Sequence, residues 1–200
     1  MSPASRAWVV LAGLLCACAV AVALAGVAPT AIDWQPSRAI AEPWRAFTAI
    51  ALHYSALHLG ANLAGAALVA ALGVSATVPA PMVWAWAVAT PLTQLGLLVR
   101  PDLLHYGGLS GALHAGAGVV AVHLLRVGPT SRRIVGLLLA IGLAAKVIGE
   151  APWGAPLRAP TGWDITTAPL AHATGLLSGV LCAAIAGAWP TRSPTTARDV

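Results

Sequence analysis

A serine flanked by glycines and a distant histidine are the two residues of this chain whose types and settings suggest catalysis. Ser110 stands in the run Gly108-Leu109-Ser110-Gly111, and His172 stands in a second apolar segment, Ala171-His172-Ala173-Thr174-Gly175. A serine hydroxyl becomes nucleophilic when a base takes its proton, and histidine suits that task near neutral pH. We therefore predict Ser110 as nucleophile and His172 as general base. No acid for the histidine stands out, which favours a dyad over a triad.

Two polar residues on another segment can stabilise the negative charge that forms during such a reaction. His58 and Asn62 are four residues apart, so on a helix they lie on the same face. Both side chains can donate hydrogen bonds, and a developing oxyanion needs preorganised donors. We predict that His58, Asn62 and the backbone N–H of Ser110 form an oxyanion site.

The composition places these residues in a lipid bilayer. Of the 200 residues, 58% are hydrophobic and only 8% are charged, whereas about a quarter of a soluble domain is charged. The net charge of +5 is spread over loops, so no nucleic-acid partner is expected. The three cysteines lie in apolar segments without metal-site spacing, and we expect neither a metal nor a cofactor.

Six apolar segments predict an all-α polytopic membrane protein, a single domain over residues 1–200. The predicted spans are Ala7–Val27, Ala56–Gly73, Met82–Val99, Leu109–Leu125, Ile134–Gly149 and Ala168–Trp189. The first segment also has features of a signal peptide, with Arg6 as its positive region and Ala23-Leu24-Ala25 as a cleavage site. Because its charge-free run reaches the ~20 residues that a bilayer needs, we favour a retained helix.

The arginines predict the orientation of these spans. A cytoplasmic N-terminus puts six arginines inside and four outside, the inner ones being Arg6, Arg126, Arg132, Arg133, Arg192 and Arg198, and the outer ones Arg38, Arg45, Arg100 and Arg158. Both termini are therefore expected in the cytoplasm. The second, fourth and sixth spans then begin at the outer surface, and this places His58, Asn62, Ser110 and His172 at a similar depth near that surface.

Small residues on the predicted helices favour close packing around Ser110. Gly175 and Gly179 share one face of the sixth span, a small-xxx-small pattern that lets two helices approach closely in lipid. We expect the fourth span to pack there and to bring Ser110 within hydrogen-bonding reach of His172. His114 lies one turn from Ser110, and we expect a packing or hydrogen-bonding role for it rather than a second base.

The motifs and their order resemble those of the rhomboid intramembrane serine proteases. Trp44-Arg45 precedes His58-Leu59-Gly60-Ala61-Asn62, then come Gly108-x-Ser110-Gly111 and Ala171-His172-x-x-Gly175-x-x-x-Gly179. The resemblance implies a six-transmembrane-helix rhomboid-like bundle, with Ser110 as nucleophile, His172 as base and no cofactor. It also implies a multi-pass protein of the bacterial cell (inner) membrane, whose active site faces outward and cuts membrane-anchored proteins.

Two stretches resemble a narrower group, the rhombosortases. Gly108–His114 is similar to their nucleophile region, and Lys146-Val147-Ile148-Gly149-Glu150 resembles their lysine–glutamate motif. That resemblance implies substrates with C-terminal GlyGly-type sorting tails, made of a Gly-rich motif, one membrane helix and a basic end. One departure from that motif is a glycine where an aromatic residue often precedes the glutamate. The fifth span also lacks the aromatic residue that stacks on the histidine base in many rhomboids.

Two roles fit Lys146 and Glu150. Lys146 and Glu150 can form an ion pair that shields both charges at the membrane edge, but lysine before glutamate is the weaker order. Our alternative hypothesis is that the pair helps to recognise the substrate.

For the whole chain, the alternative to a protease is a non-catalytic rhomboid-like protein that binds or escorts transmembrane helices. A transporter fits less well, because charged residues at the bilayer midplane are almost absent.

Overall fold

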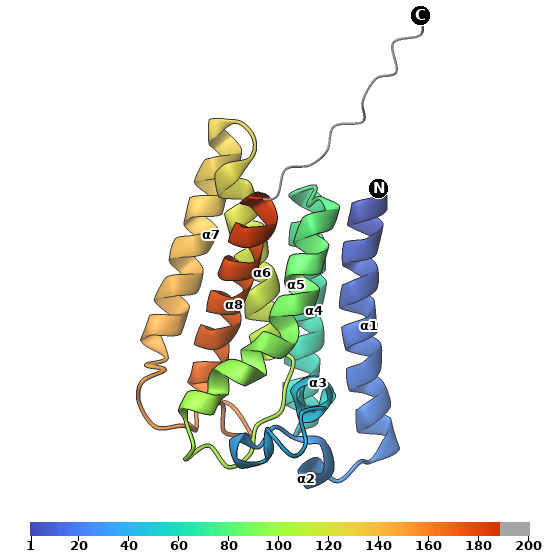
Figure 1. Ribbon diagram of the computed structural model, residues 1–200, viewed down its shortest axis with the longest axis vertical. Coiled ribbons are helices and arrows are strands. Elements are labelled where there is room, and N and C mark those ends of the chain that lie inside the picture. Colours follow the sequence, from blue (N-terminus) through green and yellow to red (C-terminus); the bar gives the residue numbers. More distant parts are fainter. Residues whose placement is uncertain (189–200) are drawn as a thin grey trace, which may run out of the picture.

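Helices dominate the part of the chain that the computed structural model describes, residues 1–188. The long helices run side by side as a bundle (Figure 1) and are α1 (Pro3–Ala25), α4 (Ala56–Ser75), α5 (Ala80–Leu95), α6 (Ser110–Arg126), α7 (Thr130–Gly149) and α8 (Pro169–Ala188). The short helices α2 (Pro29–Ile32) and α3 (Arg45–Thr48) and the 3₁₀ turns η1 (Pro36–Arg38) and η2 (Ala49–Ala51) connect α1 to α4. A third 3₁₀ turn, η3 (Gly96–Val99), continues α5.

Helices occupy all six segments in which spans were predicted. Two helices begin earlier than predicted by the same margin: α1 begins at Pro3 instead of Ala7, and α7 begins at Thr130 instead of Ile134. The predicted end of the sixth span, Trp189, lies outside the described residues. Within residues 1–188, four helices are long and apolar enough to cross a membrane, namely Pro3–Ala25, Ala56–Ser75, Ala80–Val99 and Pro169–Ala188. The 17-residue α6 is shorter than the ~20 residues of a usual span, and α7 contains Arg132, Arg133 and Lys146. The protein is therefore an all-helical membrane protein.

Local sequence signals explain where several of these helices begin and end. Ser2 and Ser55 are side-chain N-caps, accepting hydrogen bonds from the backbone N–H groups of Ser5 and His58. Gly26 ends α1 in the left-handed conformation, with φ of 60°. The Ser55 cap fixes the first turn of α4, the helix that carries His58 and Asn62.

The central helix of the bundle is α6, which packs against α4, α5, α7 and α8. Its contact with α8 depends on glycine. A Cβ atom at Gly175 would overlap the backbone of Gly111, and one at Gly179 would overlap the backbone of Ala115. The predicted close packing of the fourth and sixth segments through these glycines is therefore confirmed.

The first helix is part of the core. Trp8 of α1 is fully buried and donates its indole N–H to the Val69 carbonyl oxygen at 3.0 Å. Its ring lies 4.4 Å from the ring of Trp86 on α5. Any side chain at Gly73 would overlap the Trp8 indole, so α1 and α4 are fitted to each other.

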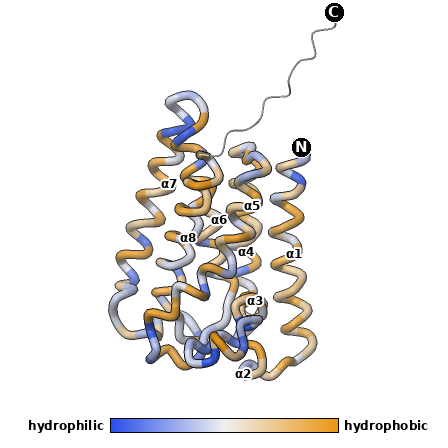
Figure 2. The backbone as a smooth tube through the Cα atoms, viewed as in Figure 1, coloured by the Kyte–Doolittle hydropathy of each residue, from blue (hydrophilic) through white to orange (hydrophobic). Residues whose placement is uncertain are grey.

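The two ends of the bundle differ in what they carry. Figure 2 shows apolar residues along the middle of the long helices and polar residues at both ends. The N-terminus and the α6–α7 turn lie at one end, with Arg6, Arg126, Arg132 and Arg133. The beginnings of α4, α6 and α8 lie at the other end, beside α2 and α3 (Figure 1). The candidate catalytic residues therefore share one end of the bundle.

Candidate active site

Ser110 is the first residue of α6 and is presented by a tightly held turn. The preceding Gly108 has φ of +142°, and a Cβ there would lie 2.9 Å from the His58 ring, so both its conformation and its surroundings require glycine. The Gly108 N–H donates to the Ala49 carbonyl oxygen at 2.9 Å. Backbone N–H groups in the first turn of a helix lack intrahelical partners. Ser110 therefore brings three features to the site: its hydroxyl, a backbone N–H donor, and the positive end of the α6 helix dipole.

His172 on α8 reaches the serine hydroxyl across the interface between two helices. Its Nε2 lies 3.0 Å from Ser110 Oγ, within the normal range of a hydrogen bond. His172 is buried. Close approach of α6 and α8 is again set by glycine, because a Cβ at Gly111 would lie 2.9 Å from the Ala171 carbonyl oxygen. The two residues that the sequence singled out are thus brought together in the structure.

A carboxylate extends this line of hydrogen bonds, a contact that the sequence did not suggest. Glu150 Oε2 lies 2.6 Å from His172 Nδ1, so the histidine has an acidic partner that the predicted dyad lacked. The other carboxylate oxygen, Oε1, lies 2.7 Å from Lys146 Nζ. The lysine–glutamate ion pair expected from the i,i+4 spacing is therefore present. A carboxylate has enough acceptor sites for both Lys146 and His172, but the i,i+4 spacing predicts only the contact with Lys146.

The two contacts of His172 select one form of its neutral ring. Ser110 Oγ can give its proton only to a ring nitrogen that carries none. A neutral imidazole with an unprotonated Nε2 has its proton on Nδ1, and that proton points at Glu150. The arrangement is therefore the one in which His172 can accept the serine proton.

The face of the His172 ring is covered by a second histidine. The His114 ring on α6 stacks on it, with centroids 4.3 Å apart and planes 16° from parallel, and His114 Nδ1 lies 2.7 Å from the Ser110 carbonyl oxygen. These contacts agree with the packing and hydrogen-bonding role predicted for His114. The ring that stacks on His172 therefore comes from the fourth predicted span and not from the fifth, which has no aromatic residue.

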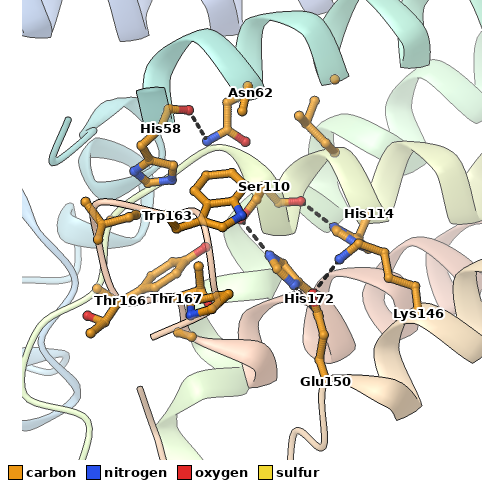
Figure 3. A pocket seen from close by; sticks show the side chains of 18 of the residues that line it. His58, Asn62, Ser110, His114, Lys146, Glu150, Trp163, Thr166, Thr167 and His172 are labelled. Atoms are coloured by element: carbon orange, nitrogen blue, oxygen red, sulfur yellow. Dashed lines mark hydrogen bonds and ion pairs between the residues drawn. The ribbon is translucent and has the colours of Figure 1, made fainter. Parts of the chain in front are cut away.

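His58 and Asn62 lie across the site from His172. Figure 3 shows them on one side of Ser110 and His172 on the other. Both are buried, and the Asn62 amide donates to the His58 carbonyl oxygen at 3.2 Å. The rings of His53 and Tyr54 pack on His58, with centroid distances of 4.7 Å and 6.5 Å. Among the described residues His58 Nδ1 has no hydrogen-bond partner, so this ring nitrogen is not committed elsewhere.

A cavity of about 780 Å³ contains the whole set of residues. His58, Asn62, Ser110, His114, Glu150 and His172 line it together with Lys146. Apolar side chains of α4 and α7, among them Leu68 and Leu143, form further parts of the wall, and the loop before α8 contributes Leu157 and Trp163. The cavity therefore combines the polar groups of a reaction site with apolar walls (Figure 3).

Charged residues of the α1–α4 connection hold this end of the bundle in place. Arg45 is buried, and its Nη1 donates to the Asp33 carbonyl oxygen at 2.9 Å and to Asp33 Oδ1 at 3.1 Å. It also pairs with Glu42. The neighbouring Trp34 pairs through its backbone with Tyr106, two residues before Gly108. Arg45 therefore supports the turn that leads into Ser110, whereas the ring of Trp44 is half exposed.

Two titratable side chains of the loops are kept neutral near the site. Burial raises the pKa of Tyr106 to about 12, and its hydroxyl donates to the Gly108 carbonyl oxygen at 3.3 Å. Burial lowers the pKa of His53, against a smaller opposing effect of its hydrogen bond to the Ala51 carbonyl. Both side chains are therefore uncharged near pH 7. No group of three His, Cys, Asp or Glu side chains is placed to bind a metal ion within residues 1–188.

Comparison with known proteins agrees with these observations. Residues 41–189 match the family described as Rhomboid domain, and the match includes each of the four motifs identified in the sequence. No curated protein matches the chain significantly. Since the family match covers most of the chain, the protein belongs to the rhomboid family.

Proposed function

We propose that the protein is an intramembrane serine endopeptidase with Ser110 as nucleophile and His172 as general base. The observation that carries the proposal is the 3.0 Å contact between Ser110 Oγ and His172 Nε2. These two polar side chains come from different helices, and both line the same cavity. Polar groups in a membrane bundle are costly unless they are paired or functional. Membership in the rhomboid family supports the same reaction.

The reaction follows from the positions of these groups. When a substrate peptide enters the cavity, the Ser110 proton moves to His172 Nε2 and Oγ forms a bond to the scissile carbonyl carbon. His172 then gives the proton to the leaving nitrogen as the C–N bond breaks. Water, deprotonated by His172, attacks the resulting ester, and the proton returns to Ser110 as the acid product leaves. No metal or cofactor takes part in these steps.

His58, Asn62 and the backbone N–H of Ser110 are the proposed oxyanion donors. The side chains of His58 and Asn62 lie on the side of Ser110 away from His172 (Figure 3), where the carbonyl oxygen of an attacked peptide would point. The N-terminus of α6 adds its dipole in the same direction. The Asn62 amide, which donates to the His58 carbonyl oxygen of its own helix, would turn to the oxyanion as charge develops.

All six long helices are proposed to cross the cell (inner) membrane, with both termini in the cytoplasm and the active site towards the outer face. The arginines at the end opposite the site support this orientation, because arginine favours the cytoplasmic side. The predicted inner residues Arg192 and Arg198 lie outside the described part of the chain. The shortness of α6 fits a helix that is enclosed by its neighbours, since most of its residues are buried.

The proposed substrates are transmembrane proteins with Gly-rich C-terminal sorting tails, as for a rhombosortase. The support is the similarity of Gly108–His114 and of the lysine–glutamate motif to that group. The apolar walls of the cavity would take up an unwound segment of a membrane helix, and small residues near the scissile bond would unwind it at little cost.

Cleavage of a reporter in proteoliposomes tests this function. The reporter carries a folded domain, a Gly-rich segment, one membrane helix and a basic end. We expect wild type to release the domain and Ser110→Ala and His172→Ala to leave it anchored. Ser178→Ala, which removes a serine of α8 outside the cavity, is the matched control and should cut normally. A folded wild type that binds the reporter without cutting it would favour the helix-escorting alternative.

A further inference from the structure

We propose that Glu150 is a positioning residue that acts through His172, so that the site works as a serine–histidine–glutamate line. This inference rests on the proposed function of Ser110 and His172. It replaces the two other roles considered for Glu150, a structural ion pair with Lys146 and a contact with the substrate.

The geometry around the histidine ring carries the inference. The distance of 2.6 Å between Glu150 Oε2 and His172 Nδ1 is short for a hydrogen bond, and hydrogen bonds to a charged group are shorter than neutral ones. The opposite nitrogen, Nε2, faces Ser110 at 3.0 Å. With the His114 ring against its face, His172 is held at both nitrogens and on one side. Rotation of the ring, which would take Nε2 away from the serine, breaks the bond to Glu150.

The backbone of Glu150 is fixed well enough to serve this purpose. Glu150 caps the end of α7, and its N–H donates to the Lys146 carbonyl oxygen at 3.1 Å. The chain then turns at Ala151, a residue with φ of 49°. The carbonyl oxygen of Glu150 accepts a hydrogen bond from Arg158 Nη1 at 2.7 Å. These contacts hold the backbone on both sides of Glu150, so its side chain reaches His172 on α8 from a fixed position.

Charge makes the carboxylate useful during the reaction. His172 becomes positively charged when it takes the serine proton, and a carboxylate at Nδ1 stabilises that form. Lys146 Nζ holds the second oxygen of Glu150 at 2.7 Å, which favours the ionised carboxylate. The side chains of Glu150 and Lys146 are 31% and 47% exposed, and ion pairs that are only partly enclosed contribute little, so the loss of this pairing alone should matter little.

The test is the rate at which a small fluorophosphonate probe labels Ser110 in the full-length protein. Such a probe needs an activated serine but not the recognition of a protein substrate. We expect Glu150→Gln to lower the maximal labelling rate about 10²- to 10⁴-fold, as for loss of the acid in other serine hydrolases. Glu150→Asp should retain more of the rate than Glu150→Gln. Lys146→Met, which leaves the carboxylate in place, should change it less than about tenfold.

A double variant and a control separate positioning from a structural role. In the His172→Ala background, Glu150→Gln should cause no further loss of labelling, because residues that act as a unit are non-additive. Asp102→Asn removes a carboxylate that pairs with Arg100 outside the cavity, and it should label like wild type. Helix content and thermal unfolding of each variant verify that the fold is kept.

The possible results distinguish the inference from the proposed function. If wild type shows no Ser110-dependent labelling, the proposed function fails and the inference fails with it. If wild type is labelled and folded Glu150→Gln is labelled equally fast, only the inference is wrong. Equal losses in Lys146→Met and Glu150→Gln would assign a structural ion pair. Normal labelling of Glu150→Gln with impaired cutting of the reporter would assign substrate recognition.

Discussion

Replacing Gly175 by alanine should uncouple the serine from its base without removing either residue. A Cβ at position 175 would lie 2.7 Å from the carbonyl carbon of Gly111, whereas ordinary contact begins at 3.4 Å. The difference is 0.7 Å, so α8 must move away from α6 by at least that amount beside Ser110. The carbonyl oxygen of Gly111 lies closer still, which makes this a lower bound.

A separation of this size removes the hydrogen bond on which the proposed reaction depends. Added to the 3.0 Å between Ser110 Oγ and His172 Nε2, it takes the pair beyond the ~3.2 Å limit of good hydrogen bonds. A misplacement of about 1 Å can cost about 10²-fold in rate. We therefore expect Gly175→Ala to lower reporter cleavage about 10²-fold.

Two other glycines provide controls for this variant. Gly142 on α7 has open space where a Cβ would be, so Gly142→Ala should leave the rate unchanged. Gly179→Ala makes a similar overlap with Ala115 one turn further from Ser110. It should destabilise the protein as much as Gly175→Ala while slowing cleavage less. If folded Gly175→Ala cleaved the reporter at the wild-type rate, the close approach of α6 and α8 would not set the distance from Ser110 to His172.

Further variants test other parts of the site. Asn62→Ala should slow reporter cleavage by about 10²–10³, the usual effect of losing one oxyanion donor, with unchanged thermal unfolding. His114→Ala should lower the labelling rate up to about tenfold, because a stacked ring pair is worth about 0.5–1.5 kcal/mol, and His114→Phe should recover part of that loss. Arg45→Met should destabilise the fold by about 3–5 kcal/mol, since it takes the guanidinium away from the buried Asp33, whose remaining side-chain partners are Gln35 and His105; an unchanged unfolding temperature would contradict this role.

The helices and the serine–histidine pairing were predictable because their signals are local. Apolar runs long enough for a bilayer mark the helices whatever packs against them. The spacing of Gly175 and Gly179 places both on one face of α8, which predicts that another helix can approach there. Since Ser110 and His172 both begin such helices, a shared end of the bundle follows because two long helices, α6 and α7, separate them.

The acid partner was missed because its position depends on where the chain turns. Glu150 stands at the end of α7, and the side chain reaches His172 only because the backbone reverses at Ala151 before the loop to α8. No local pattern encodes that reversal. The i,i+4 spacing already gave Glu150 a partner in Lys146, so nothing in the sequence suggested a second partner for Glu150.

The stacking ring was within reach of sequence reasoning. His114 is four residues after Ser110 and shares its helix face. Any ring that meets the Ser110 hydroxyl from α8 therefore has to lie close to His114. The stacking residue was expected on the fifth span, whereas it lies on the helix that carries the proposed nucleophile.

The measurement that tests the central claim most directly is covalent labelling mapped to a single residue. Detergent-solubilised wild type, Ser110→Ala and His172→Ala are each treated with the fluorophosphonate probe, and the modified peptide is identified by mass spectrometry. We predict a label on Ser110 in wild type, none in Ser110→Ala and only trace labelling in His172→Ala. An unlabelled wild type that is folded, or equal labelling of His172→Ala, would contradict a serine activated by this histidine.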